Sequence, residues 1–328
     1  GLSVNDMKRI IAYSTISTIG FMMLALGSGI LGFTAGIFLL MNHAFFKALV
    51  FLAAGSVLHA TGLLDIHKMG GLHKKMKITS IAMFIGVFSA AGLPPFSGFF
   101  GKDEVLLATL NATATNPVYS VLFVMSLVTA FLTVVFLFRM WFLIFTGTPR
   151  SNFEAHESPR VMTVPLLILS ALAIGSGFSL FIGPGFGSFV FFEHAEVLQF
   201  SPLVTISSVS AGLAGLLVAY LLYYKQSYPS NRFYSGRFGN GLLRILMNKY
   251  WMDHIFYGFA EKVSYRFTLV IDWFDLYGID GIVNGIGSGL ATAGTKLRRI
   301  QTGFVSVYAT IIAIGMIVLM IWLVLVGV

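Results

Sequence analysis

One apolar run decides the fold of this chain: residues 39–51 read LLMNHAFFKALVF. The run lies near the middle of an apolar stretch from about 33 to 59, which is long enough to cross a membrane as a helix. At 1.5 Å per residue, Lys47 would lie roughly 18–20 Å from either end of that helix, too far for its side chain to reach water comfortably. Its ammonium must therefore find water, a partner or neutrality inside the membrane. The usual reason to keep such a charge there is an ion or proton path.

The whole chain has the composition of a membrane protein. Of its 328 residues, 57% are hydrophobic and only 10% are charged, whereas a soluble globular chain has about 25% charged residues. Basic residues are in excess but form no compact patch, so nucleic acid is not expected as a partner. Cysteine is absent, which excludes disulfides and iron–sulfur ligation. The sequence also lacks phosphate-loop and dinucleotide fingerprints, and we expect neither a cofactor nor a metal in this chain.

Apolar segments of spanning length predict an all-α polytopic membrane protein with about eight membrane helices, one of them short. The expected helices cover residues 8–28, 33–59, 78–91, 96–110, 117–145, 161–182, 202–224 and 302–326. Gly and Pro residues at 92–95 interrupt the third, so 96–110 is expected to continue it as a discontinuous helix. Residues 230–299 are too polar to span, and their helical apolar spacing predicts a lateral amphipathic helix before the C-terminal anchor helix.

The distribution of basic residues predicts an orientation. If residues 96–110 cross the membrane, most basic loop residues fall on the same side as the lateral segment, which the positive-inside rule makes the cytoplasmic side. If residues 96–110 are re-entrant, the assignment of everything after them reverses.

His43 and Lys47 form the first candidate site. They are four residues apart, which puts them on one helix face about 6 Å from each other. An imidazole beside a desolvated lysine makes a proton-transfer pair. The alternative is a structural lysine that pairs with a carboxylate on another helix.

The helix break forms the second candidate site. Broken membrane helices line cavities, and their half-helix ends make ion sites. Lys102, Asp103 and Glu104 directly follow the break. The alternative is an ordinary polar loop between two helices.

Three further groups receive weaker assignments. Lys8, near Asp6, is either part of a buried path or a plain boundary charge. Arg139 lies in the last third of its helix, from which its side chain can reach the interface, so we assign it no role. The histidines at the loop ends do not have the spacing of a zinc site: His59, His67 and His73.

Three motifs resemble the antiporter-like subunits of respiratory complex I. They are DMKRIIAYSTISTIGFM at 6–22, NHAFFKAL at 42–49 and GFFGKDE at 98–104. The lysine–aspartate order of the third motif is similar to that of the L subunit, whereas the M and N subunits have a glutamate at the lysine position. A lateral segment followed by an anchor is also typical of the L subunit.

This resemblance implies roles for individual residues. Lys47 and His43 would belong to a central hydrophilic axis. Lys102 would be the terminal lysine on the discontinuous helix, where it exchanges protons with the external side, and Asp103 would modulate it. In many L subunits a second histidine precedes the first by four residues, and Leu39 stands at that position here, so the relay there needs water or another side chain.

The resemblance also implies a division of the chain. Residues 1–147 correspond to the second antiporter-like repeat with its proton half-channel, and Asp6 and Lys8 would lie at the junction of the two half-channels. Further membrane helices occupy 148–229, the lateral segment 230–300 and the membrane anchor 301–328. The family's first repeat is missing, so we expect a fragment of a longer protein or one product of a split subunit.

The predicted function is that of a proton-translocating membrane subunit of an NADH-quinone oxidoreductase-type complex. The chain would be part of an enzyme without redox chemistry of its own. Its partners would be protons, the lipid of the inner (cytoplasmic) membrane and neighbouring antiporter-like subunits along the lateral helix. One alternative is an Mrp-type cation/proton antiporter subunit, and another is a structural clamp that transports no ion. The electron donor and the choice of proton or sodium stay open.

Overall fold

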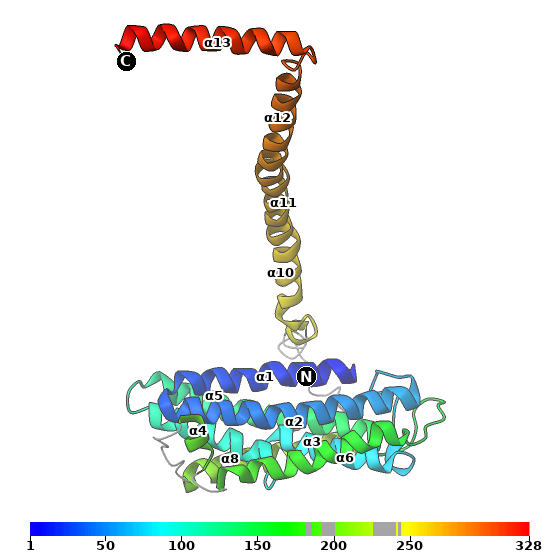
Figure 1. The fold of residues 1–328 in the computed structure, drawn as a ribbon. Coiled ribbons are helices and arrows are strands. Elements are labelled where there is room, and N and C mark those ends of the chain that lie inside the picture. Colours follow the sequence, from blue (N-terminus) through cyan, green and yellow to red (C-terminus); the bar gives the residue numbers. More distant parts are fainter. Residues whose placement is uncertain (182–184, 192–200, 226–240, 242–243, 328) are drawn as a thin grey trace. The chain divides into compact units, whose positions relative to one another are not determined.

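The computed structural model describes residues 1–181, 185–191, 201–225, 241 and 244–327, and this part of the chain is helical without a strand (Figure 1). It divides into two compact units, Gly1–Asn248 and Lys249–Val328, which we describe separately. Six of the described helices are long and apolar enough to cross a membrane. The prediction of an all-α, multi-pass membrane protein is therefore confirmed, while the total of eight membrane helices stays a prediction.

The first unit is a bundle in which α2 is central. Its helices are α1 (Met7–Gly27), α2 (Gly29–Thr61), α3 (Lys77–Ala91), α4 (Ser97–Ala112), α5 (Val118–Phe145), α6 (Arg160–Gly175), α7 (Phe186–Phe191) and α8 (Pro202–Ala219). A 3-10 turn, Ser176–Phe181, extends α6, and a π-helical turn, Tyr220–Tyr224, extends α8. The helix α2 packs against α1, α3, α4 and α6, and Figure 1 shows α1 and α2 side by side.

The start of α1 and the end of α2 lie side by side, and local interactions determine where each helix begins or ends. Asp6 caps α1, because its Oδ1 accepts a hydrogen bond from the backbone N–H of Arg9 at 3.0 Å. Gly62 ends α2 with a φ of 69°, a conformation that glycine adopts without strain. An isolated antiparallel bridge between Asp6 and Asp65 then joins the start of α1 to the loop after α2.

The helix break predicted at residues 92–95 lies between α3 and α4. Gly92, with a φ of 77°, ends α3. Two prolines come after Leu93, and proline does not fit the interior of a helix. Ser89 Oγ, near the end of α3, lies 2.9 Å from Ser97 Oγ and accepts a hydrogen bond from Gly98 N at 3.1 Å. A side chain at Gly98 would meet the Ser89 carbonyl oxygen at 1.9 Å, so the two half-helices approach this closely only because residue 98 is glycine.

The second unit holds a long helical run and a separate apolar helix. The run consists of α10 (Met252–Phe259), α11 (Tyr265–Trp273) and α12 (Asp280–Arg298), joined by the π-helical turns Ala260–Ser264 and Phe274–Ile279. The helix α13 (Val305–Val326) is one of the six candidate spans. Helix is therefore confirmed over much of the predicted lateral segment, but residues 230–240 and 242–243 lie outside the described residues, and its placement along a membrane stays a prediction.

Candidate functional site

Lys47 is buried in the first unit, with 6% of its surface exposed. Its Nζ donates to the carbonyl oxygen of Ile11 at 3.1 Å and to the hydroxyl of Ser14, both in α1. Both of these partners are neutral oxygen atoms, and the ion pair between Lys249 and Asp253 does not involve Lys47. A role for Lys47 in proton transfer and the alternative of a structural lysine paired with a carboxylate both stay predictions.

Lys102 is buried at the helix break, with 5% of its surface exposed. Its Nζ donates to the carbonyl oxygens of Ala90 at 2.7 Å and Ala91 at 3.2 Å, which are the last residues of α3. It also lies 5.5 Å from the ring centroid of Phe21 in α1. Because the C-terminal end of a helix carries partial negative charge, the break holds a cation where the helix dipole favours it.

Both ammonium groups contact the same helix. Lys47 bonds to Ser14 and Lys102 lies over Phe21, seven residues further along α1. Seven residues correspond to a rise of about 10 Å. Thr18 lies between them on the same face of α1, 3% exposed, and its Oγ1 donates to the Ser14 carbonyl oxygen at 2.9 Å. Buried hydroxyl groups therefore stand on the α1 surface between the two lysines.

His43 lies one turn before Lys47 on α2. Its ring packs edge-on against Phe46, with 5.4 Å between the ring centroids. Its Nε2 atom is buried and has no hydrogen-bond partner among the described residues. The neighbouring Asn42 is fully buried and accepts a hydrogen bond from Ser176 Oγ at 2.7 Å. This stretch of α2 thus brings polar groups into the interior, one of them unsatisfied.

The two carboxylates after Lys102 have different surroundings. Asp103 accepts hydrogen bonds from Thr205 Oγ1 at 2.7 Å and Ser208 Oγ at 2.8 Å, so it contacts α8. Glu104 has a buried Oε2 atom without a hydrogen-bond partner in the described ranges. Any effect of Asp103 on Lys102 therefore stays a prediction, since its hydrogen bonds go to α8.

The predicted site residues Asp6 and Lys8 lie at the N-terminal end of α1. Asp6 has the structural task of capping the helix, and the Lys8 side chain is exposed. The exposed Lys8 side chain contrasts with the buried side chains of Lys47 and Lys102. Roles for Asp6 and Lys8 at a junction of half-channels stay predictions.

Arg139 is a buried residue that the sequence reasoning missed. It is 5% exposed, and its guanidinium donates to the Val4 carbonyl oxygen at 2.8 Å and to Asn5 Oδ1 at 2.6 Å. It also contacts His67 Nε2 at 3.2 Å. Partial burial, and next the charge of Arg139, lower the pKa of His67 below its ordinary value. Arg139 thereby joins α5 to the segment before α1. No local sequence pattern predicts this contact, because the two segments are far apart in the sequence.

Glu157 is a second residue that the sequence reasoning missed. One carboxylate oxygen accepts from the backbone N–H of Ile78 at 2.8 Å and the other from Thr79 Oγ1 at 2.6 Å, both at the start of α3. Ser56 of α2 lies 2.8 Å from the Thr79 hydroxyl and 2.6 Å from that of Ser158. A carboxylate therefore caps the N-terminal end of the same helix whose C-terminal end holds Lys102.

Comparison with known proteins places these features in a family. Residues 1–133, which contain both buried lysines, match the family described as NADH:quinone oxidoreductase/Mrp antiporter, TM. The F(420)H(2) dehydrogenase subunit L of Methanosarcina mazei is 38% identical, over 98% of this chain and 52% of that protein. The NADH-quinone oxidoreductase subunit L of Neisseria meningitidis is 31% identical, over 98% of this chain and 53% of that protein. This chain thus spans about half the length of these curated relatives.

A solved structure is also similar. The Mrp complex from Dietzia sp. DQ12-45-1b contains a chain that matches with a TM-score of 0.49 and 23% identity, over 66% of this chain and 46% of that chain.

Proposed function

Because this chain belongs to the family of antiporter-like L subunits of NADH-quinone oxidoreductases, we propose that it moves protons along a buried axis of lysine and histidine side chains. Electron transfer in other subunits of a respiratory complex would drive this movement. One observation carries the proposal: α2 and α4 each bury an ammonium group among neutral oxygen atoms instead of carboxylates.

Neutral partners suit a group that must both hold and release a proton. A buried ammonium paired with a carboxylate gains a large Coulomb energy, which opposes release of its proton. The Ser14 hydroxyl can accept from a protonated lysine or donate to a neutral one, and it donates to the Ile11 carbonyl oxygen at 2.7 Å in the present arrangement. At the second site, a neutral amine of Lys102 would still have two N–H groups for the two α3 carbonyl oxygens.

The spacing of their contacts on α1 supports charge coupling between the two lysines. Ser14 and Phe21, which contact Lys47 and Lys102, are separated by a helical rise of about 10 Å. Two unit charges at such a separation, with an effective dielectric constant near 20, repel by about 1.7 kcal/mol, which is more than tenfold in an equilibrium constant. A proton that arrives at Lys47 therefore favours release at Lys102, and the reverse also holds. His43 Nε2 and Glu104 Oε2, which have no hydrogen-bond partner among the described residues, supply further polar positions for a hydrated path between the two lysines.

The second unit supports an additional bracing role. Its helices expose nearly all of their large apolar side chains, a surface that lipid or partner subunits would cover. We propose that the helical run Met252–Arg298 contacts neighbouring membrane subunits on the cytoplasmic side of the inner membrane and that α13 anchors it. Replacing charges along this run separates bracing from transport, because bracing predicts loss of assembly before loss of turnover.

Two variants of Lys47 test the transport proposal in the full-length protein, assembled with its partners in sealed vesicles. Lys47→Gln removes the proton carrier, and Lys47→Arg keeps the charge but cannot release a proton, because arginine stays protonated in proteins. Both should lower proton translocation and donor oxidation together by at least tenfold, and Lys68→Gln, a change of an exposed loop lysine, should alter neither.

Normal translocation in both Lys47 variants would refute the proposed path. Sodium transport without quinone-linked electron transfer would favour the Mrp-type alternative instead.

A further inference from the structure

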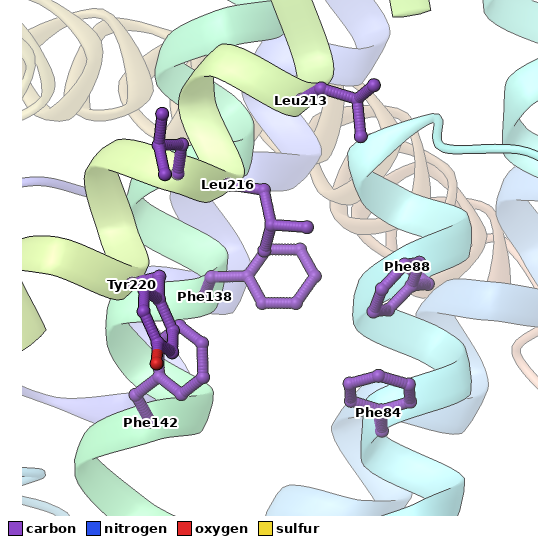
Figure 2. A pocket seen from close by; sticks show the side chains of 8 residues that line it. Phe84, Phe88, Phe138, Phe142, Leu213, Leu216 and Tyr220 are labelled. Atoms are coloured by element: carbon purple, nitrogen blue, oxygen red, sulfur yellow. The ribbon is translucent and has the colours of Figure 1, made fainter. Parts of the chain in front are cut away.

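An apolar groove runs along the outside of the first unit, between α3 and α8, with α5 as its floor (Figure 2). Its volume is about 440 Å³. Figure 2 shows two aromatic rings of α3 facing the side chains of α5 and α8 across the open space. The main lining residues are Phe84, Phe88, Phe138, Phe142, Leu216 and Tyr220. Tyr220 carries the one polar side-chain group in the lining that the structure describes, so the groove suits a hydrocarbon chain.

The two ends of the groove differ. At one end α8 approaches the helix break, where a side chain at Gly212 would meet Leu93 Cδ2 at 2.6 Å. The other end lies between Phe84 and Tyr220. Trp141 stands beside it, with 5.0 Å between its ring centroid and that of Phe84. Tryptophan and tyrosine gather at membrane–water interfaces, so this end of the groove has the chemistry of a headgroup region.

Exposed basic residues continue from this aromatic end. The helix α3 begins at Lys77, seven residues or about 10 Å before Phe84. Lys225 follows the π-helical turn of α8, five residues or about 8 Å beyond Tyr220. Both lysine side chains are exposed. Two lysines therefore flank the aromatic end of the groove, and the nearby carboxylate of Glu157 is hydrogen-bonded to the start of α3.

The length of this arrangement matches a lipid chain. From Leu213 to Tyr220 the groove follows α8 for about 10 Å, and Lys225 lies about 8 Å further on. The combined length, about 18 Å, is close to half the thickness of a bilayer's hydrocarbon core, about 15 Å, plus the short distance from there to the lipid phosphate. One acyl chain can thus fill the groove while its phosphate lies near the lysines.

We propose that this groove binds an acyl chain of an anionic phospholipid, with the phosphate held by Lys77 and Lys225. Lipid binding here would buttress α3 from outside, and α3 carries the carbonyl oxygens of Ala90 and Ala91 that hold Lys102. The proposal does not depend on proton transport, since it needs only a membrane around the bundle.

Fluorescence of Trp141 can report on the groove. Replacing Trp251, Trp273 and Trp322 with phenylalanine leaves Trp141 as the one tryptophan of this chain. The full chain is then reconstituted into vesicles that contain increasing fractions of dibrominated phosphatidylglycerol or dibrominated phosphatidylcholine. Quenching should be half-complete at a lower mole fraction of phosphatidylglycerol, by about fivefold for each lysine, as is typical of one basic residue beside anionic lipid.

Variants separate the groove from the general lipid surface. The double change Lys77→Gln and Lys225→Gln should remove the preference for phosphatidylglycerol. Leu213→Phe narrows the groove and should weaken quenching by both lipids. Leu203→Phe should not, because Leu203 is an exposed α8 leucine outside the lining, 62% exposed against 55% for Leu213.

Two results would overturn the proposal. Equal quenching by both lipids, unchanged by Leu213→Phe, would show that Trp141 meets only bulk lipid. Absence of quenching by either lipid would show that a protein helix covers the groove.

Discussion

Gly98→Ala tests the geometry of the helix break. A Cβ atom at this position would lie 1.9 Å from the carbonyl oxygen of Ser89 and 2.8 Å from its carbon. Both are backbone atoms, so no flexible side chain can yield and α4 must move away from α3. Lys102 lies one turn further along α4 and would lose or lengthen its bonds to the end of α3.

The expected cost follows from these contacts. Overpacking typically costs about 1–3 kcal/mol, and a hydrogen bond to a charged group contributes about 1.5–3 kcal/mol. We therefore expect a lower thermal unfolding midpoint in detergent and, in sealed vesicles, at least a tenfold loss of proton translocation.

A matched control exists in α2. Gly55 is also a helical glycine, but a Cβ there would have nothing within 4 Å. Gly55→Ala should leave translocation unchanged and stabilise the protein by about 0.5–1 kcal/mol. If Gly98→Ala behaves like Gly55→Ala in both assays, the close approach of α3 and α4 has no part in positioning the buried cation.

Three further changes test other contacts. Ser14→Ala leaves the α2 lysine a single carbonyl partner and should lower translocation about tenfold, whereas Ser17→Ala, for which no side-chain hydrogen bond is described, should not. Glu157→Gln removes the carboxylate from the start of α3 and should lower the free energy of unfolding by about 1 kcal/mol, measured by denaturant titration. Burial and the charge of Arg139 lower the pKa of His67 in the folded state, so the unfolded state binds the proton first and stability should fall as the pH drops below 6.5. His67→Asn should reduce the fall of the thermal unfolding midpoint with decreasing pH. If the midpoint falls as steeply in the variant, groups other than His67 cause the acid dependence.

The sequence predicted the helices well because spanning length is a local property. It also predicted burial of Lys47, since a lysine near the middle of a helix of that length has no route to water. The sequence could not predict the hydrogen-bond partner of Lys47, because its contact with Ser14 depends on how α1 packs against α2. The same limit explains Arg139, whose position near a helix end suggested an interface, whereas the segment before α1 covers it. It also explains Asp103, whose hydrogen bonds go to α8, about a hundred residues away in sequence.

The central claim is that protons pass between buried lysines on α2 and α4. Its most direct test is proton translocation by Lys102→Ala in the full-length protein, assembled with its partners in sealed vesicles, with donor oxidation measured in parallel. The account predicts that the assembled variant loses translocation by at least tenfold and that donor oxidation falls with it. Translocation and oxidation at the unmodified rates would contradict the account.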